Sequence, residues 1–284
     1  MRRQCWTVVC ALCVLCAFGF LEANAQEAHH KITAQEVAEA LADPSATITY
    51  GNLNFRVYKD VGYMPALNPY GLPEQDLDET NQELRLNGAG FFHGPANTTV
   101  LYRAFLPTYS TNFPFSHSGV GDALVSAYAV PKGGGSLIIG YGAAMMMPTA
   151  TQDYFGTGKW SGGPTLVVAK KVPGKFTVGG LLTHMWSFAG DEDREDVSIS
   201  TIQPVFSYFL NRKGTALALG SETTYNWEAD DDEWTVPVTL GLSQILPPFG
   251  RFFMGIALAG SYYIEKSDYS QEWDMRGTLS IVLP

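Results

Sequence analysis

The chain has 284 residues with 28 acidic and 18 basic side chains, and 16% of its residues are charged, where about 25% is typical of soluble domains. The formal net charge of −10 excludes a nucleic-acid partner on electrostatic grounds. The four cysteines are Cys5, Cys10, Cys13 and Cys16, so everything downstream has neither a disulfide, a thiolate metal site nor a cysteine nucleophile.

The amino-terminal segment has the order of a secretory signal peptide. Arg2 and Arg3 precede an apolar run over residues 5–21, and the small residues of Ala23-Asn24-Ala25 follow. We therefore expect cleavage near Ala25. Removal of residues 1–25 takes away two arginines and Glu22, which leaves a net charge of −11.

A short helix is expected next. Thr33-Ala-Gln-Glu36 is a capping box, Val37, Ala38 and Leu41 follow at helical spacing, and Asp43-Pro44 ends the pattern. The sequence predicts an amphipathic helix within a periplasmic segment over 26–46. A plug and a periplasmic contact are the alternative roles for it.

From Thr47 onward, apolar residues recur with period two, which indicates β-strands. The clearest case is Trp234–Ser243, where large apolar residues alternate with small or polar ones. Most expected strands are 9 to 14 residues long, and about 9 to 11 residues cross a bilayer at a tilt of about 45°. The twelve expected strands are 47–58, 84–92, 98–106, 119–130, 136–147, 164–171, 175–188, 197–210, 214–227, 234–245, 252–264 and 274–284.

The connections between these strands alternate in length and in charge. Short turns of three to five residues, with lysine and arginine nearby, alternate with longer loops that contain the acidic runs 191–196 and 230–233. Outer-membrane barrels have short periplasmic turns and long outer loops. A soluble sandwich, the alternative, would have no reason for this sorting. The predicted fold is all-β: an antiparallel up-and-down transmembrane barrel over 47–284, of about 12 strands (10 to 12), in the bacterial outer membrane.

Polar side chains on the face opposite the apolar one are expected to line the lumen, because a charge facing lipid at the midplane costs about 2 to 4 kcal/mol. Arg56 is a weaker candidate of this kind, with Asn52 and Asn54. The candidates for solute binding or passage are Arg103, Glu222, Asn226 and Arg276.

The acidic runs are candidates for weak binding of a divalent cation, since carboxylates are hard oxygen donors. A solvated loop is the alternative, because neither run has calcium-loop spacing. The candidate ligands are Asp191, Asp193, Asp230, Asp231 and Asp232. No cofactor is expected.

Nothing in the sequence assembles an enzyme site. A barrel hydrolase needs a serine or threonine within hydrogen-bond reach of a histidine. Ser187 is three residues from His184 and is expected on the opposite face, while His184 itself belongs with Trp186 near an aromatic girdle. We therefore predict that the protein is not an enzyme.

An ordered set of motifs between Val37 and Pro284 resembles a family of outer-membrane transporters known as MetA-pathway of phenol degradation proteins. The motifs are Pro148-Thr-Ala-Thr151, Gly156-Thr-Gly-Lys-Trp160, His184-Met-Trp-Ser-Phe-Ala-Gly-Asp191, Gln203-Pro204 with Tyr208, Tyr225-Asn-Trp-Glu-Ala-Asp230 and Trp234-Thr-Val-Pro237. The resemblance implies a barrel and a transport role, and brings no catalytic residues. The chain departs from the family pattern at its carboxyl end, Ile-Val-Leu-Pro, and over residues 63–78.

The predicted function is passage or uptake of a small solute, with an aromatic or apolar solute suggested by the family alone. The alternative is a structural or surface-interaction barrel with a closed lumen. The expected partners are outer-membrane lipids and lipopolysaccharide, the solute, and the barrel assembly machinery during insertion.

Overall fold

A computed structural model describes residues 32–59, 80–95, 97–111, 117–131, 136–229, 234–266 and 271–283. The predicted signal peptide and Asp230, Asp231 and Asp232 lie outside these ranges. The described strands are β1 (Thr49–Lys59), β2 (Thr80–His93), β3 (Thr98–Thr111), β4 (His117–Val120), β5 (Ala123–Pro131), β6 (Leu137–Met147), β7 (Lys159–Val172), β8 (Phe176–Gly190), β9 (Ser198–Phe209), β10 (Thr215–Gly220), β11 (Thr223–Asn226), β12 (Trp234–Ile245), β13 (Phe253–Glu265) and β14 (Trp273–Leu283).

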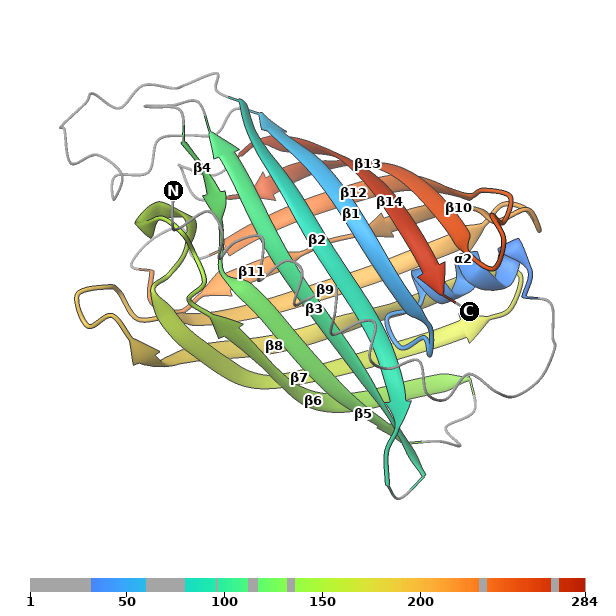
Figure 1. Cartoon of the computed structure of the whole chain (residues 1–284), viewed down its shortest axis with the longest axis horizontal. Helices are drawn as coiled ribbons and strands as arrows, with labels where there is room; N and C mark the ends of the chain where they lie inside the picture. The colour runs from blue at the N-terminus through green and yellow to red at the C-terminus, as the bar shows by residue number, and fades with distance from the viewer. Residues whose placement is uncertain are drawn as a thin grey trace. The chain divides into compact units, whose positions relative to one another are not determined.

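These segments form a closed barrel of twelve antiparallel strands, as the sequence predicted (Figure 1). Each strand pairs with its neighbours in chain order, and β1 pairs with β14 from Thr49↔Leu283 to Lys59↔Trp273, which closes the sheet. Two barrel strands are each divided into two segments, β4 with β5 and β10 with β11. A closed barrel leaves no unpaired sheet edge, which is the requirement for a sheet in lipid.

The division between β10 and β11 has a local cause. Ser221 lies opposite Pro204 of β9 and donates its backbone N–H to the Pro204 carbonyl at 3.1 Å. Proline has no N–H to return the second bond of the pair. The register of the strand continues across the gap, from Gly220↔Val205 to Thr223↔Ile202. The side chain of Glu222 therefore points toward the lumen, as it would in an uninterrupted strand.

Side chains alternate between the two faces of the wall. On β12, Val238, Leu240 and Leu242 are 44 to 55% exposed on the outer face. Thr239 points inward, where its hydroxyl is 2.9 Å from the Ser261 hydroxyl. Exposed leucines in such numbers would be a liability in water, and they form the apolar exterior that lipid requires.

The predicted helix is present as α2 (Ala34–Ala42) and has the predicted capping box at Thr33 and Glu36. It packs against the inner face of the barrel at the end where the short turns lie. Val37 and Ala38 are buried there against four inward-facing residues, Phe209, Ala216, Ile245 and Val282. The plug role is thus the one that this packing favours.

Polar contacts fix α2 to the turn between β7 and β8. The Gly174 N–H donates to Glu39 Oε1 at 2.8 Å, and Asp43 Oδ2 lies 3.6 Å from Lys171 Nζ. Gly174 has φ of +71°, and a Cβ there would lie 2.9 Å from Gln35 Nε2. Only glycine suits both the turn and the helix that packs on it.

Several predicted strand boundaries were too narrow. β2 begins at Thr80 rather than residue 84, β3 continues to Thr111 rather than 106, and β7 begins at Lys159 rather than 164. The extra residues are largely polar, so the apolar alternation did not include them. Ladder hydrogen bonds do not depend on side-chain polarity, and the strands therefore extend beyond the apolar band at the long-loop end.

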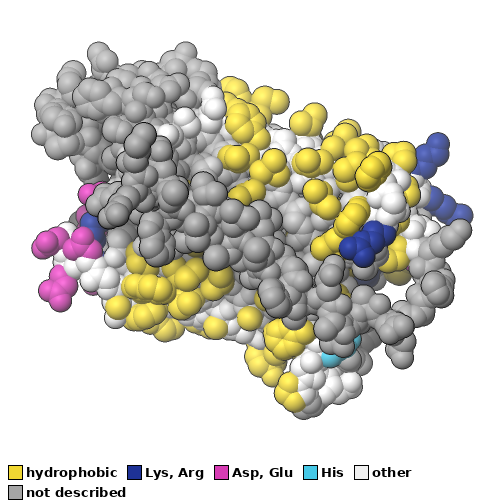
Figure 2. Space-filling view, in the orientation of Figure 1, with side chains coloured by type: hydrophobic (Ala, Val, Ile, Leu, Met, Phe, Trp, Pro, Cys, Tyr) yellow, Lys and Arg dark blue, Asp and Glu magenta, His cyan; other side chains and the backbone are white. Residues whose placement is uncertain are grey.

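The two ends of the barrel differ in charge. Figure 2 shows acidic side chains gathered at one end, lysine and arginine at the other, and an apolar band between them. Among the described residues, the acidic end includes Asp191, Glu192 and Asp193, and the basic end includes Arg212 and Lys213. None of the helices described is both long and apolar enough to cross a membrane.

Candidate functional site: a polar network in the barrel lumen

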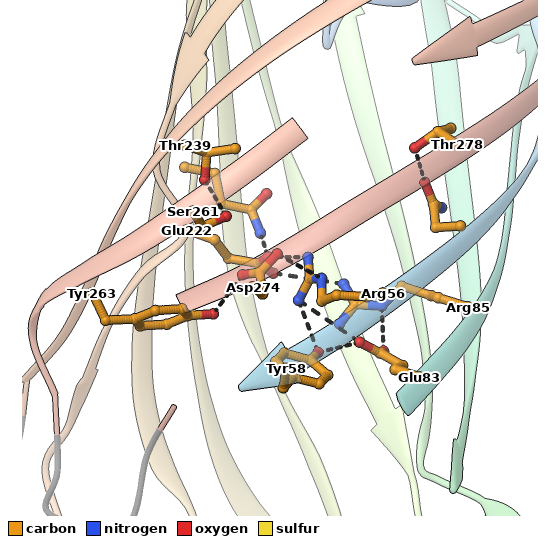
Figure 3. A network of polar contacts seen from close by, with 12 residues as sticks. Arg56, Tyr58, Glu83, Arg85, Glu222, Thr239, Ser261, Tyr263, Asp274 and Thr278 are labelled. Carbon is orange, nitrogen blue, oxygen red and sulfur yellow. Dashed lines mark hydrogen bonds and ion pairs between the residues drawn. The ribbon is translucent and has the colours of Figure 1, made fainter. Parts of the chain in front are cut away.

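Four side chains of β1 and β2 form a tight polar cluster on the inner wall (Figure 3). Glu83 is its centre and is only 1% exposed. Glu83 Oε1 accepts a 2.7 Å hydrogen bond from Arg85 Nε, and Glu83 Oε2 accepts one from the Tyr58 hydroxyl. Arg56 Nη1 donates to Tyr58 at 3.0 Å and lies 3.7 Å from Glu83 Oε2.

The cluster continues across the closing seam of the barrel. Asp274 of β14 is 1% exposed, and its Oδ1 lies 3.7 Å from Arg56 Nε. Its Oδ2 accepts a 3.1 Å hydrogen bond from Tyr263 of β13. Arg56 thus has a buried carboxylate on each side, because β2 and β14 are the two neighbours of β1. A buried cation is tolerable only with such pairing.

Glu222 reaches this cluster from another part of the barrel wall. Its carboxylate oxygens lie 3.9 Å from Arg56 Nη2 and 4.0 Å from Arg85 Nη1. Glu222 follows β10, and β12, β13 and β14 separate that strand from β1. In a barrel of twelve strands, four steps lead from that strand to β1 and five to β2. The ion pairs therefore cross the lumen between separate parts of the wall.

The contacts of Glu222 are looser than those of the wall cluster. Its side chain is 40% exposed, and its distances to both arginines exceed hydrogen-bond length. Its Oε1 also accepts a 3.1 Å hydrogen bond from Gln203 Nε2 on β9. Glu222 is therefore the least tightly held member of the network.

The structure places the four predicted lumen residues on the inner face, but it does not bring them together. Glu222 belongs to the network. Arg276 faces inward opposite Arg56, and Arg103 is opposite Ser126 of β5. Asn226 ends β11 near the loop rim, where its Oδ1 accepts the Glu228 N–H at 3.2 Å. Their role in solute binding or passage stays a prediction.

Most of the network was missed in the sequence. Glu83 and Arg85 were not proposed, because Glu83 was assigned to a loop, and Asp274 was the first residue of a predicted strand without a role. The available signal was alternation: Glu83 and Arg85 are separated by one leucine, as are lumen residues of one strand. Which strands meet across the lumen is not encoded in any local pattern.

An apolar patch occupies another part of the inner wall. Leu101, Tyr128 and Val167 are at most 3% exposed and pack with Phe91, Val130 and Leu181. Gly140 lies beneath this patch, and a Cβ there would be 2.7 Å from both Val130 and Val167. This apolar part of the interior is therefore packed, in contrast to the charged wall.

The acidic run 191–196 is organised by local contacts. Asp191 Oδ1 accepts the Asp193 N–H at 3.0 Å. Asp196 accepts from Lys159 Nζ at 3.1 Å and from the Ser187 hydroxyl at 3.0 Å, and the lysine hydrogen bond lowers the pKa of Asp196. Within the described ranges, no group of three or more possible metal ligands is assembled. The divalent-cation hypothesis stays a prediction for both runs, and Asp230, Asp231 and Asp232 lie outside the described residues.

His184 lies on the outer face, in an aromatic group with Trp186 and Trp227. Its hydrogen-bond partner is Ser200 of β9 rather than Ser187, with Nδ1 and Oγ 2.9 Å apart. The Ser200 hydroxyl also accepts a 2.9 Å hydrogen bond from Trp227 Nε1. These bonds satisfy polar atoms in an aromatic belt, where amphipathic rings are usual.

The sequence matches no family model and no curated protein. The structure is similar to an outer membrane channel from Pseudomonas putida F1, with a TM-score of 0.63 and 16% identity over 85% of this chain and 97% of that one. It is also similar to the NanC porin, with a TM-score of 0.54 and 10% identity over 83% and 99% of the two chains. The fold is that of outer-membrane β-barrels.

An outer membrane phospholipase A from Escherichia coli has a TM-score of 0.47 and 11% identity over 89% of this chain and 98% of that one. A likeness at that level says nothing about chemistry in this chain. The named family resemblance is not confirmed by these comparisons and stays a prediction.

Proposed function

We propose that this protein is a channel of the bacterial outer membrane that lets small solutes pass. The observation that carries the proposal is a polar, charged lumen inside a wall whose outer face is apolar. Arg56, Arg85 and Glu222 meet within this lumen, as expected for a filter rather than a packed core. The similarity to a channel and a porin supports this role.

An aromatic or apolar solute is the class that we favour. The family resemblance of the sequence is the support for this class. The apolar residues around Leu101, Tyr128 and Val167 are packed against one another, so a solute would contact the ion-pair network rather than this cluster.

A closed structural barrel is the second candidate, and α2 is the observation that favours it. The helix occupies part of the lumen at the short-turn end, with Val37 only 2% exposed. If α2 stays in place, the acidic loops at the other end would be the working surface. Outer-membrane lipids, lipopolysaccharide and the assembly machinery are partners under either role.

Single-channel recording in planar bilayers separates the two candidates. We expect defined conductance steps from the full chain, and larger steps from a variant that lacks residues 33–46. Heat-modifiable migration on gels confirms that each sample is folded. Silence from both folded proteins would contradict the channel. Steps only after the deletion would mean that α2 closes the resting barrel.

A matched control shows whether the helix itself matters. Val37→Asp places a charge in the buried contact with Phe209 and Ile245, whereas Glu36→Gln changes the exposed end of the same helix. We expect larger or more frequent openings from Val37→Asp and wild-type steps from Glu36→Gln.

A further inference from the structure

Arg276 faces the lumen and, unlike the neighbouring Arg56, has no carboxylate partner among the described residues. It lies directly opposite Arg56 in the β1–β14 ladder, so two like charges share one cross-strand site, an arrangement that is destabilising by itself. Arg56 has Glu83 and Asp274 within 3.7 Å. Arg276 belongs to none of the ion pairs in the described part of the chain, and its Nε is buried without a hydrogen-bond partner.

The charges around this level balance in number but not in contact. Three inward-facing arginines, Arg56, Arg85 and Arg276, accompany three lumen carboxylates, Glu83, Asp274 and Glu222, whereas Arg103 lies farther along the wall, opposite Ala89. Glu83 and Asp274 are 1% exposed and committed to the wall. All three carboxylates pair with Arg56 or Arg85, and in the described part of the chain none of them is within ion-pair distance of Arg276.

Glu222 shows that a carboxylate in the lumen can reach two of these arginines. It does so from a separate part of the wall, at 3.9 and 4.0 Å and with 40% of its side chain exposed. An exposed ion pair at such distances is weak. A carboxylate from a solute can make the shorter, paired contacts that arginine favours and displace Glu222.

We propose that the lumen binds the carboxylate of a small organic anion at Arg276, Arg56 and Arg85, with Glu222 as a built-in competitor. The inference rests on the channel function proposed above and names its solute class, small carboxylic acids. The guanidinium groups hold the carboxylate.

Benzoate is the probe, and benzyl alcohol is its uncharged counterpart. We expect benzoate to interrupt the current of single channels in a concentration-dependent way, and benzyl alcohol to have no such effect. Arg276→Gln should raise the half-blocking benzoate concentration at least tenfold. Glu222→Gln should lower it several-fold, because the competing carboxylate is gone. Arg212→Gln, with the same charge change in an exposed turn, should leave it unchanged.

Two further arms keep the test decisive. If Arg276→Gln does not fold, Arg276→Lys keeps the charge but loses the planar fork, and it should still weaken the block. Inorganic phosphate tests the ligand chemistry, and a block by phosphate as strong as that by benzoate would overturn the assignment to carboxylates. Equal block by benzyl alcohol, or a full benzoate effect in the Arg276 variants, would overturn the site.

Calorimetric titration of benzoate into the folded barrel in detergent separates this inference from the channel function. A barrel that never conducts but binds benzoate through Arg276 contradicts the channel and keeps the site. A barrel that conducts normally and neither binds benzoate nor is blocked by it contradicts the site and keeps the channel.

Discussion

Glu222 Oε1 lies 4.0 Å from Arg85 Nη1, although the two residues come from separate parts of the barrel wall. This pair and the neighbouring contact to Arg56 are ion pairs that cross the lumen. Arg85 is also held by Glu83 at 2.7 Å. Arg85 is therefore held firmly by Glu83, whereas its ion pair with Glu222 is looser.

Replacing Glu222 with Gln should change conduction more than stability. The variant loses both cross-lumen ion pairs and one negative charge, so we expect a larger single-channel conductance and a shift of the reversal potential toward anion preference in a KCl gradient. Because the pair is exposed and long, the free energy of unfolding should change by less than about 1 kcal/mol. Glu228→Gln, in the exposed loop after β11, is the control and should alter neither quantity much.

Replacing Glu83 with Gln should change stability more than conduction. Glu83 is 1% exposed and bonded to Arg85 and Tyr58, so its neutralisation leaves two buried arginines short of a counter-charge. Breaking a buried pair in this way costs about 3 to 5 kcal/mol. Urea unfolding in lipid vesicles measures the loss. A cost no greater than that of Glu222→Gln would mean that water reaches the wall cluster freely.

Two adjacent residues of β12 test the facing of the wall. Leu240 is 55% exposed on the outer face, and Thr239 faces the lumen near Ser261. Leu240→Arg should lower the unfolding free energy by about 2 to 4 kcal/mol and impair insertion, because it places a charge in lipid. Thr239→Arg should insert normally, and folding assays in vesicles compare the two. Equal damage from both would show that the assigned register is wrong.

The contact of Glu39 with the Gly174 turn tests how firmly α2 is docked. Glu39 is 7% exposed and accepts the Gly174 N–H. Glu39→Ala removes this hydrogen bond, and because Gly174 is in an exposed turn, water can replace it, so the cost should be about 0.5 to 1.5 kcal/mol. We expect more frequent openings in single-channel records, and faster amide exchange over residues 34–42. Unchanged exchange in the helix would show that the apolar contacts of Val37 and Ala38 suffice.

The charge difference between the two ends predicts the orientation in the membrane. An epitope inserted at Asp193 should be reached by antibody on intact cells, because long loops face outward in outer-membrane barrels. The same epitope at Lys213, in a short turn, should be reached only after the outer membrane is opened. Labelling at Lys213 in intact cells would show that the short turns, and not the long loops, face outward.

Local sequence patterns were sufficient for the elements of this fold. The capping box at Thr33 and Glu36 fixed the start of α2, because a helix end has orphan donors that only nearby side chains can satisfy. The alternation of Val238, Thr239 and Leu240 assigned outer and inner faces, because successive side chains of a strand point to opposite sides. Twelve such stretches with alternating connections predicted a closed barrel.

Contacts between distant strands were decided only by the tertiary structure. Arg56 and Arg276 are opposite each other because β1 closes on β14, and Glu222 meets Arg85 because the barrel brings separate parts of its wall within side-chain reach. The position of α2 likewise depends on the closed sheet, which brings Phe209, Ala216, Ile245 and Val282 together around the helix. A strand's period is set by its own backbone, whereas the partner of a lumen side chain depends on closure and stagger of the whole sheet, which no local pattern carries.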